Sequence, residues 1–391
     1  MKSQKVIVNI SSAQTVPNYL FIREMATSGD ILWFISSQEY SNRVDWIVNT
    51  LKQSSPDQTY TTVQTVFANK DDETSWKSMQ EQVSIKIDPS KEYVVNLTGG
   101  TKYMEFAIHD VMAKLPNVRF YYIHHPFNYI LTVDKESKVL PIKYRVNIRE
   151  YFLLYNRKAE NYGIKPHLPA QYTDKYIEHY AHFTEEDWNI IDLIRTGKDR
   201  YDRKAGYRGK SIDLSTIEDT PGENEIRCPA IPGLNAFLER HDFPVKDNKL
   251  SRSDNVYLTG GWFEEYVYNF ISRKIKPRDI TLGLKIDTQD GNDLDVVFTK
   301  GNKLYVIECK TGFEREVMLK EIVYKASAIG SMLRGITVSS YIFTMQDAGD
   351  NQEKYAGICK NMNITYVGRE SFINENGMDL LAQSIINSSH D

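Results

Sequence analysis

Asp295, Glu308 and Lys310 are the residues of this sequence whose types and spacing point most directly to chemistry. The two acids are expected to face each other on paired strands, which would hold their Cβ atoms about 4.5–5.5 Å apart. Adjacent carboxylates repel, and one takes up a proton unless a cation lies between them. Mg²⁺ and Mn²⁺ are hard cations that bind through one or two carboxylates and keep several waters. Such a bound cation can direct a water onto a phosphodiester, so the residues predict a phosphodiester hydrolase.

A predicted β-hairpin brings these residues together. Residues 294–299 and 304–310 are rich in β-branched and aromatic side chains, as strands are. Gly301-Asn302 between them is a favourable two-residue turn. Counting outward from this turn places Asp295 opposite Glu308.

Lys310 and Cys309 complete the expected site. Lys310 lies two residues after Glu308 and therefore shares its face of the sheet. It can orient or deprotonate the attacking water, or neutralise the charge that grows on the phosphate. The Cys309 side chain is expected in the core, while its backbone carbonyl is a further candidate metal ligand. The alternative is a solvated strand face, because 26% of the chain is charged; the apolar strand around the two facing acids favours a site.

Asp295 followed by Glu308-Cys309-Lys310 resembles the core motif of the PD-(D/E)XK nucleases. The resemblance implies that Asp295 and Glu308 bind the metal and that Lys310 serves the hydrolysis. The family has a restriction-endonuclease-like α/β fold.

The family also has helices on either side of the hairpin. The helix before it often supplies another acid, which the resemblance makes a further candidate metal ligand, and in residues 259–271 Glu264 matches that position better than Glu265. Glu264 can equally be a first-turn acid that interacts with the helix dipole. The following helix, residues 316–333, carries Lys325, which resembles an extra polar residue of many members or is a solvated lysine.

Residues 1–150 show a different pattern, in which strands alternate with helices. Strands are predicted at 6–10, 31–35, 62–67, 93–97, 119–124 and 129–133, and helices at 43–51, 74–85 and 98–114. Several strands are continuously apolar, which favours a parallel sheet with helices on both faces. Ligands of such sheets bind beyond the carboxyl ends of the strands. The polar loops expected there contain Ser11, Ser12, Gln14, Ser37, Thr98, Gly99, Gly100, Thr101 and Lys102.

The loop from Thr98 to Lys102 suits an anion. Gly99 and Gly100 let backbone N–H groups approach a phosphate, and the helix N-terminus that follows favours negative charge. Thr98 and Thr101 add hydroxyl groups, and Lys102 adds a cation. The alternative is a tight strand-to-helix connection without a ligand.

The string Asn96-Leu97-Thr98-Gly99-Gly100-Thr101-Lys102 after the fourth strand resembles the CRISPR-associated Rossmann-fold (CARF) sensor domains. The resemblance covers roughly residues 1–150. It implies a homodimer that binds cyclic oligoadenylate, with cyclic tetra-adenylate as the expected ring, across its two-fold axis. Together with the PD-(D/E)XK motif it implies a ligand-activated nuclease of type III CRISPR defence. Members use Mn²⁺ or Mg²⁺ and cut single-stranded DNA or RNA, or nick duplex DNA.

The predicted organisation is a CARF domain at 1–150, a connector with a small helical segment at 151–250 and a PD-(D/E)XK domain at 251–391. The connector contains a segment, 198–210, with six basic and two acidic residues and two tyrosines. Basic and aromatic groups together suit a nucleic-acid strand. A flexible, solvated linker is an equal reading of the segment.

Composition sets the remaining expectations. The net charge is −4, which does not by itself suggest a nucleic-acid partner. The competing function is a non-enzymatic, ligand-responsive regulator that binds DNA through the middle segment. Three distant cysteines argue against disulfides and fit a reducing cytoplasm. We expect no signal peptide and no membrane span, because no apolar run approaches about 18 residues.

Overall fold

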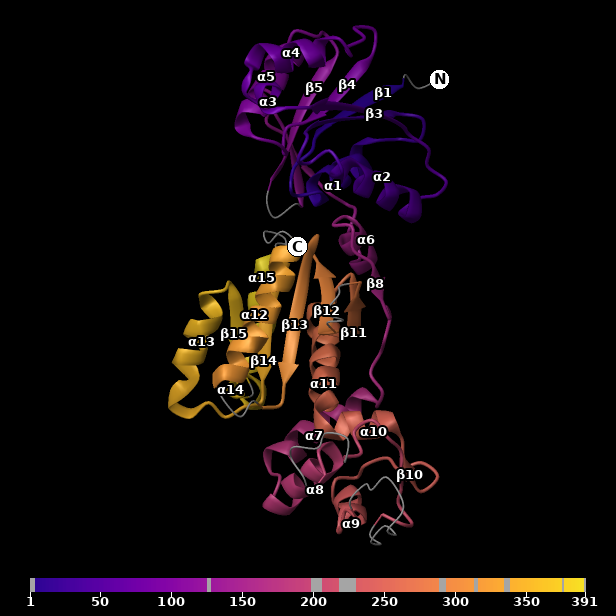
Figure 1. The fold of residues 1–391 in the computed structure, drawn as a ribbon, viewed down its shortest axis with the longest axis vertical. Helices are drawn as coiled ribbons and strands as arrows, with labels where there is room; N and C mark the ends of the chain where they lie inside the picture. The colour runs from indigo at the N-terminus through magenta and orange to yellow at the C-terminus, as the bar shows by residue number, and fades with distance from the viewer. Residues whose placement is uncertain are drawn as a thin grey trace.

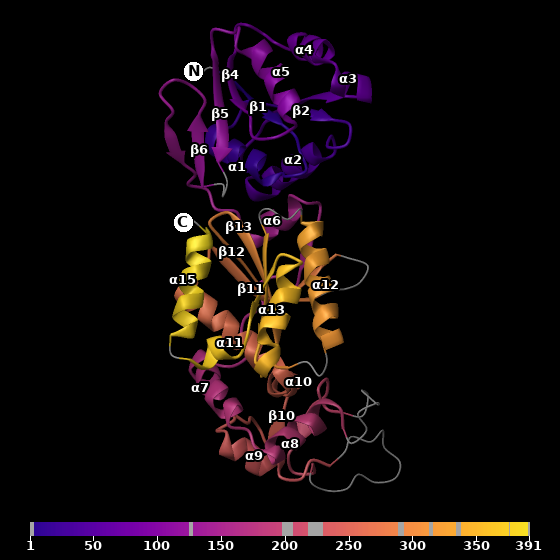
Figure 2. The same cartoon turned by 90° about the vertical axis from the view of Figure 1, so that its left-hand side faces the viewer.

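The computed structural model describes residues 4–124, 128–197, 206–217, 230–287, 293–312, 316–333, 338–374 and 376–389. The molecule is elongated (Figure 1). The N-terminal sheet lies at one end, the sheet that carries Asp295 and Glu308 lies in the middle, and a small helical insertion lies at the far end (Figures 1 and 2). Within these ranges no helix is both long and apolar enough to cross a membrane.

The N-terminal sheet has seven strands in the order β3-β2-β1-β4-β5-β6-β7. The first five pair in parallel and the last two are antiparallel. The strands are β1 (Lys5–Ile10), β2 (Ile31–Ser37), β3 (Thr61–Phe67), β4 (Glu92–Asn96), β5 (Val118–His124), β6 (Tyr129–Thr132) and β7 (Val139–Pro141). The parallel sheet expected from the alternating pattern is confirmed.

Helices cover both faces of this sheet, as predicted. On one face α1 (Val16–Met25) and α2 (Arg43–Ser54) form a common core with apolar residues of the sheet. On the other face α4 (Trp76–Ser84) and α5 (Lys102–Met112) do the same.

Two details differ from the sequence expectation. Helix α1 was not predicted, because seven consecutive residues from Val16 to Ile22 are buried and no polar face reveals the helical period. The helix predicted over 74–85 is instead α3 (Lys70–Thr74) followed by α4. The break lies at Ser75, whose extended backbone ends α3 and whose side chain caps α4 by accepting the Ser78 N–H.

The central sheet has six strands in the order β15-β14-β13-β12-β11-β8. Strands β11 (Asp279–Ile286), β12 (Asp293–Lys300) and β13 (Lys303–Lys310) are antiparallel, whereas β14 (Val338–Thr344) and β15 (Ile364–Val367) extend the sheet in parallel to β13. The short β8 (Ala159–Glu160) pairs with β11.

The predicted hairpin is confirmed with its register. Lys300 pairs with Lys303, and the ladder continues to Val296 opposite Ile307. The turn residues Gly301 and Asn302 both have positive φ, 54° and 58°, as a type I′ turn requires.

Helices also cover both faces of the central sheet. The first face packs against α11 (Trp262–Phe270) and α15 (Gly377–Ser389). The second face packs against α12 (Glu316–Met332) and α13 (Gln352–Lys360). The helices predicted before and after the hairpin therefore exist where the sequence placed them.

The helical insertion contains α7 (Ala170–Ala181), α8 (Glu185–Arg195) and α9 (Leu234–Arg240), with a two-stranded ladder of β9 (Ile212–Asp213) and β10 (Lys249–Leu250). It returns to the central sheet through α10 (Arg252–Val256) and a widened turn, η1 (Tyr257–Gly261), that leads into α11. Its apolar residues join the core of the central sheet.

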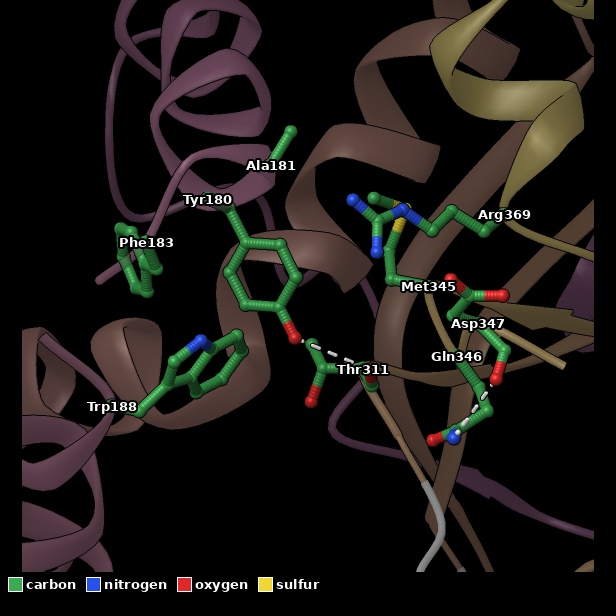
Figure 3. Close-up of a pocket in the computed structure, with 9 residues that line it drawn as sticks. All are labelled: Tyr180, Ala181, Phe183, Trp188, Thr311, Met345, Gln346, Asp347 and Arg369. Atoms are coloured by element: carbon green, nitrogen blue, oxygen red, sulfur yellow. Dashed lines mark hydrogen bonds between the residues drawn. The ribbon is translucent and has the colours of Figure 1, made fainter. Parts of the chain in front are cut away.

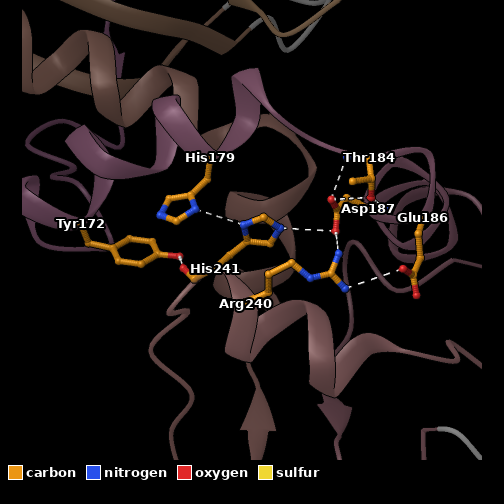
Figure 4. Close-up of polar contacts among 7 residues, drawn as sticks. All are labelled: Tyr172, His179, Thr184, Glu186, Asp187, Arg240 and His241. Carbon is orange, nitrogen blue, oxygen red and sulfur yellow. Dashed lines mark hydrogen bonds and ion pairs between the residues drawn. The ribbon is translucent and has the colours of Figure 1, made fainter.

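A buried carboxylate ties the three helices of the insertion together (Figure 4). Asp187 accepts from the backbone N–H and hydroxyl of Thr184 and thereby caps α8. The same carboxylate contacts Arg240 at 2.8 Å and His241 at 3.4 Å. His241 in turn lies 3.2 Å from His179 on α7, measured between the two Nδ1 atoms. The described helices of the insertion are therefore packed together through this carboxylate.

The short helix α6 (Ile148–Leu153) joins the two sheets. Its N-terminal N–H, on Ile148, donates to Asp279 of β11 at 3.0 Å, while Glu150 accepts from Tyr19 of α1 at 2.8 Å. Apolar residues of α1, α2, α6 and the central sheet form one continuous core. The N-terminal and central sheets are thus joined by packing as well as by the chain.

Candidate functional site

The three residues singled out by the sequence meet at the end of β12 and β13. The Lys310 ammonium lies 2.8 Å from Glu308 Oε1 and 3.2 Å from Asp295 Oδ2. It also donates to the backbone carbonyl of Cys309 at 3.1 Å. Three oxygens from three residues therefore converge on one positive charge.

Asp295 is held in place where the strand ladders are interrupted. Its Oδ2 accepts the backbone N–H of Cys309 at 2.7 Å. Counted from the turn, the ladder with β13 ends at Val296, so that it stops one residue short of Asp295. The β11 residue beside Asp295 is Gly283, whose φ is 53°. Such local disruptions of a ladder re-aim side chains and are common beside active sites.

The oxygens of Asp295, Glu308 and Cys309 form a donor set that suits Mg²⁺ or Mn²⁺. Both ions prefer oxygen ligands and need only one or two carboxylates. Across the described ranges, no group of three or more His, Cys, Asp or Glu side chains is arranged to hold a metal. The set is thus two carboxylates and one main-chain carbonyl, and the Lys310 ammonium marks the point where they meet.

Burial and mutual repulsion shift the charges of this site. Burial, reinforced by the charge of Glu308, raises the pKa of Asp295 to about 6. Burial, reinforced by the charge of Asp295, raises the pKa of Glu264 to about 8. Burial lowers the pKa of Lys310, but Asp295 and Glu308 raise it by more, so that the ammonium stays charged. Burial and the neighbouring acids thus disfavour the ionised carboxylates, whereas a bound divalent cation would favour them.

Glu264 and Glu265 have different surroundings. Glu264, on the first turn of α11, interacts electrostatically with Asp295, Glu308 and Lys310. Glu265 is buried and accepts the backbone N–H of Leu168 at 3.1 Å, so it anchors the insertion. The approach of Glu264 depends on Gly260, whose φ of 135° favours glycine and turns the chain into α11.

Lys325 of α12 also reaches the site. Its ammonium lies 3.7 Å from Glu308 Oε1 and donates to the backbone carbonyl of Asp293 at 3.1 Å. The geometry places all five expected residues, Glu264, Asp295, Glu308, Lys310 and Lys325, in one electrostatic cluster.

The basic segment at 198–210 lies partly outside the described residues, which resume at residue 206. Asn255 of α10 fixes its described end by donating to the carbonyls of Tyr207 and Lys210 at 3.2 and 2.7 Å. Arg208 between them lies close enough to Glu264 to act on its pKa. The sequence suggested a basic segment, but only the fold brings Arg208 to the carboxylate cluster.

A second site lies at the carboxyl ends of the N-terminal sheet. A cavity of about 530 Å³ is bounded there by loops after β1, β2 and β4. Eight of the nine residues expected to bind a ligand line it, namely Ser11, Ser12, Gln14, Ser37, Thr98, Gly99, Gly100 and Thr101. Lys102 is exposed and is not among the lining residues. The sequence did not single out Asn18, Glu39, Tyr40 or Glu73, which also line the cavity.

The glycine loop of this cavity is built by close packing. A Cβ on Gly99 would lie 1.9 Å from the carbonyl oxygen of Ile10, so only glycine fits. The Thr98 hydroxyl donates to Asn96 at 2.6 Å and accepts the Ile123 N–H at 2.7 Å. Thr101 caps α5 by accepting the Met104 N–H at 3.2 Å. The threonine hydroxyls therefore shape the loop, and the α5 N-terminus provides the positive end of a helix dipole at the cavity.

Comparison with known proteins assigns a family to each of the two domains. Residues 6–151 match the family model of the Card1 CARF domain, and residues 252–370 match that of the Card1-like endonuclease domain. The chain therefore combines a domain of the Card1 CARF family with a domain of the Card1-like endonuclease family. The two matches together cover more than half of the chain and include the glycine loop and the whole carboxylate cluster.

Solved structures share the fold of this CARF endonuclease over its whole length. Protein VC1899 from Vibrio cholerae aligns with a TM-score of 0.74 at 14% identity and 98% coverage of both chains. Can2 from Sulfobacillus thermosulfidooxidans, in complex with cyclic tetra-adenylate, aligns with a TM-score of 0.69 at 18% identity and 99% coverage of both.

A third structure is a type III CRISPR defence DNA nuclease activated by cyclic oligoadenylate. It aligns with a TM-score of 0.53 at 13% identity over 88% of this chain and 46% of the other. Among curated proteins, no sequence matches significantly.

Proposed function

We propose that this protein is a metal-dependent nuclease of type III CRISPR defence, activated by cyclic oligoadenylate and acting on single-stranded DNA or RNA or nicking duplex DNA. The observation that carries the proposal is the convergence of Asp295, Glu308 and the Cys309 carbonyl on the Lys310 ammonium. It lies in a domain of the Card1-like endonuclease family. The nuclease structure that matches 88% of this chain is activated by cyclic oligoadenylate, which supports the same switch here.

Asp295, Glu308 and the Cys309 carbonyl would hold Mn²⁺ or Mg²⁺. When bound, the cation polarises the phosphodiester and lowers the pKa of a water. In the metal-free protein, the Lys310 ammonium pairs with both carboxylates. With a divalent cation in that role, its ammonium can turn to the non-bridging phosphate oxygens and stabilise the negative charge of the transition state. Lys325, 3.7 Å from Glu308, adds a second positive charge on the side of α12.

Glu264 has a pKa of about 8 and is therefore mainly protonated at neutral pH in the metal-free protein. A divalent cation would favour its ionised form, because an opposite charge lowers the pKa of a carboxyl group. The Glu264 carboxylate would then orient a water by accepting a hydrogen bond from its O–H. This role explains why an acid is placed in an already acidic cluster.

The CARF cavity would bind cyclic oligoadenylate, with cyclic tetra-adenylate as the expected ring, because Can2 is seen with that ligand. The α5 N-terminus and the main chain at Gly99 and Gly100 suit the phosphates of the ring. Two CARF domains of a homodimer would enclose the ring between their cavities.

The structure offers a direct route from the CARF domain to the metal site. The β12–β13 hairpin carries Asp295 and Glu308 at one end and its turn at the other. The buried turn residue Asn302 accepts the Val146 N–H at 3.0 Å. Val146 lies within the matched CARF segment. A ligand-induced rotation of the CARF domain would therefore act on the hairpin whose register sets the distance between the two acids.

The decisive experiment measures cleavage of labelled single-stranded and duplex substrates with Mn²⁺, with and without cyclic tetra-adenylate. Cleavage that needs both metal and ligand, and that is lost in Glu308→Ala, supports the proposal. Equal cleavage without ligand would remove the switch. Sequence-specific DNA binding that needs neither Glu308 nor Lys310 would instead identify a non-enzymatic regulator.

A further inference from the structure

A separate cavity of about 340 Å³ lies between the helical insertion and the endonuclease sheet (Figure 3). One wall is aromatic and consists of Tyr180, Phe183 and Trp188 from α7, α8 and the loop between them. The opposite wall includes Thr311, Gln346 and Arg369, which follow the carboxyl ends of β13, β14 and β15. The carboxyl ends of parallel strands are where α/β sheets bind ligands.

This cavity begins one residue beyond the proposed metal site. Thr311 follows Lys310 directly, and neighbouring Cα atoms are about 3.8 Å apart. The Tyr180 hydroxyl donates to the Thr311 carbonyl at 3.2 Å and so fixes the aromatic wall to the end of β13. A strand whose phosphate lies at Lys310 therefore has its next nucleotide beside the cavity.

Trp188 is the exposed part of the aromatic wall. The residue is 41% exposed, although it packs against Tyr180 and Phe183 at centroid distances of 5.0 and 5.4 Å. Both contacts are near perpendicular, at 80° and 71°, so the neighbouring rings hold the indole by edge-to-face packing. The cap formed by Asp187 fixes the first turn of α8 from which Trp188 projects. The indole is thus held in a set orientation and is partly open to solvent.

Positive charge stands across the cavity from these rings. Figure 3 shows the Arg369 guanidinium on the wall opposite Trp188. In the part of the chain that the structure describes, no ion pair engages this guanidinium. Its charge acts on the Tyr180 hydroxyl, against the burial that raises the pKa of that group to about 12. The Asp347 carboxylate lines the same side of the cavity. An aromatic wall, the Arg369 guanidinium and the polar side chain of Gln346 together have the chemistry of a nucleotide site.

We infer that this cavity binds one unpaired nucleobase of the substrate strand, beside the phosphate that is cleaved. Trp188 is the stacking surface, and Arg369 contacts the adjoining phosphate. A base inside a duplex is stacked on both faces and paired at its edge, so the cavity favours single strands over duplexes. The inference rests on the proposed nuclease function and specifies its substrate class.

The first test is binding without cleavage. Fluorescence anisotropy with the full-length protein, cyclic tetra-adenylate and Ca²⁺ would compare a labelled single-stranded 12-mer with the duplex of the same sequence. Trp188→Ala should weaken single-strand binding about tenfold, as expected for the loss of one stacked base. Trp188→Phe should restore most of it. Trp76 of the CARF domain is similarly exposed, at 36%, and Trp76→Ala should change nothing.

Arg369→Ala should give a different signature. Loss of one phosphate contact weakens binding to all sequences and reduces the slope of log affinity against log salt by about 0.7 for a single strand. Trp188→Ala should leave that slope unchanged. Unchanged single-strand affinity in Trp188→Ala, or an equal loss for single strand and duplex, would overturn the inference.

The second test maps cuts in strands that carry one abasic position. In the wild type, an abasic position should reduce cleavage at the phosphate that lies a fixed number of nucleotides away. In Trp188→Ala this local reduction should disappear. The same pattern in both proteins contradicts a base site at Trp188 and leaves the nuclease proposal standing. A wild type that cuts nothing refutes the nuclease proposal, while the binding comparison still decides whether Trp188 stacks on a base.

Discussion

The two sites of this chain handle negative charge in opposite ways. The endonuclease site concentrates full charges, with three acids and two lysines in a partly buried cluster. The CARF cavity, which Glu39 and Glu73 also line, offers an anion a helix N-terminus and the main chain at two glycines. Its threonine hydroxyls shape the loop, and Lys102 is not among the lining residues. Hydrolysis needs a strong local field at one atom. A sensor must release its ligand, and dipoles spread over a loop bind a ring of phosphates reversibly.

The difference predicts that side-chain changes will be most damaging in the endonuclease site. Glu308→Ala should abolish cleavage, because it removes a metal ligand and leaves Lys310 with one carboxylate fewer. Lys310→Ala should reduce the rate at least about a hundredfold, the loss expected for one charge that stabilises a transition state. The measurement is single-turnover cleavage with Mn²⁺ and saturating cyclic tetra-adenylate. Calorimetry should show that both variants still bind the ligand.

Exposed residues of α13 provide the matched controls. Glu353→Ala and Lys360→Ala remove the same charges from the surface of the same domain and should leave the rate unchanged. Residual cleavage above a tenth of the wild-type rate in Glu308→Ala would mean that another group holds the metal.

In the CARF cavity, a backbone change should matter more than a charge change. Gly99→Ala should abolish activation by ligand, because the new Cβ would clash with the Ile10 carbonyl at 1.9 Å and move the loop. Lys102→Ala should change the activating concentration of cyclic tetra-adenylate only a few-fold, since the side chain does not line the cavity. Cleavage would be measured against ligand concentration.

Gly357→Ala is the control for the glycine change, because nothing lies within 4 Å of the added Cβ on α13. If Lys102→Ala were as damaging as Gly99→Ala, the distinction between dipole-based and charge-based binding would fail.

A substitution at the contact between the CARF domain and the hairpin should affect ligand binding and cleavage differently. Asn302→Gly keeps the positive φ of the turn, 58°, but removes the oxygen that accepts the Val146 N–H. Leaving that buried donor unpaired costs about 1–3 kcal/mol. We expect ligand affinity to stay within a few-fold while maximal ligand-stimulated cleavage falls about tenfold. Isothermal titration and cleavage assays would give the two values.

Asn363→Gly is the matched control for the turn, since Asn363 has a φ of 56° on the exposed surface before β15. A uniform loss of stability and activity in both variants would show that the Asn302 contact is structural only.

The smallest effect is expected from proton binding by Glu264. Its pKa in the folded protein, about 8, is above the ordinary value of 4.5, so the folded state binds the proton more tightly than the unfolded state. The metal-free protein should therefore lose stability as pH rises from about 4.5 to about 8, and Glu264→Gln should flatten this fall. Thermal unfolding in EDTA across this range measures it.

Added Mn²⁺ should reverse the trend in the wild type, because ionised Glu264 and Asp295 favour the cation at higher pH. A variant whose stability falls with pH as steeply as the wild type would show that Glu264 is not the titrating group.

Much of the proposed metal site could be predicted from the sequence, because its geometry is local. Strand residues alternate with a period of two, and a two-residue turn sets the pairing, so the order of residues around Gly301-Asn302 determined that Asp295 and Glu308 would meet. A ligand site at the Gly99-Gly100 loop could be predicted because ligands of parallel sheets bind at the carboxyl ends of the strands.

Only the tertiary structure decided which residues from distant parts of the chain lie beside the hairpin and the glycine loop. Packing of the insertion brought Arg208 to Glu264 and placed Trp188 across from Arg369, residues far apart in the chain. Elsewhere in the fold, Lys102 is not among the residues that line the CARF cavity, and Asn302 accepts the Val146 N–H. Local backbone geometry depends on neighbouring residues, whereas these contacts depend on how several apolar faces bury one another, and no short stretch of sequence contains that information.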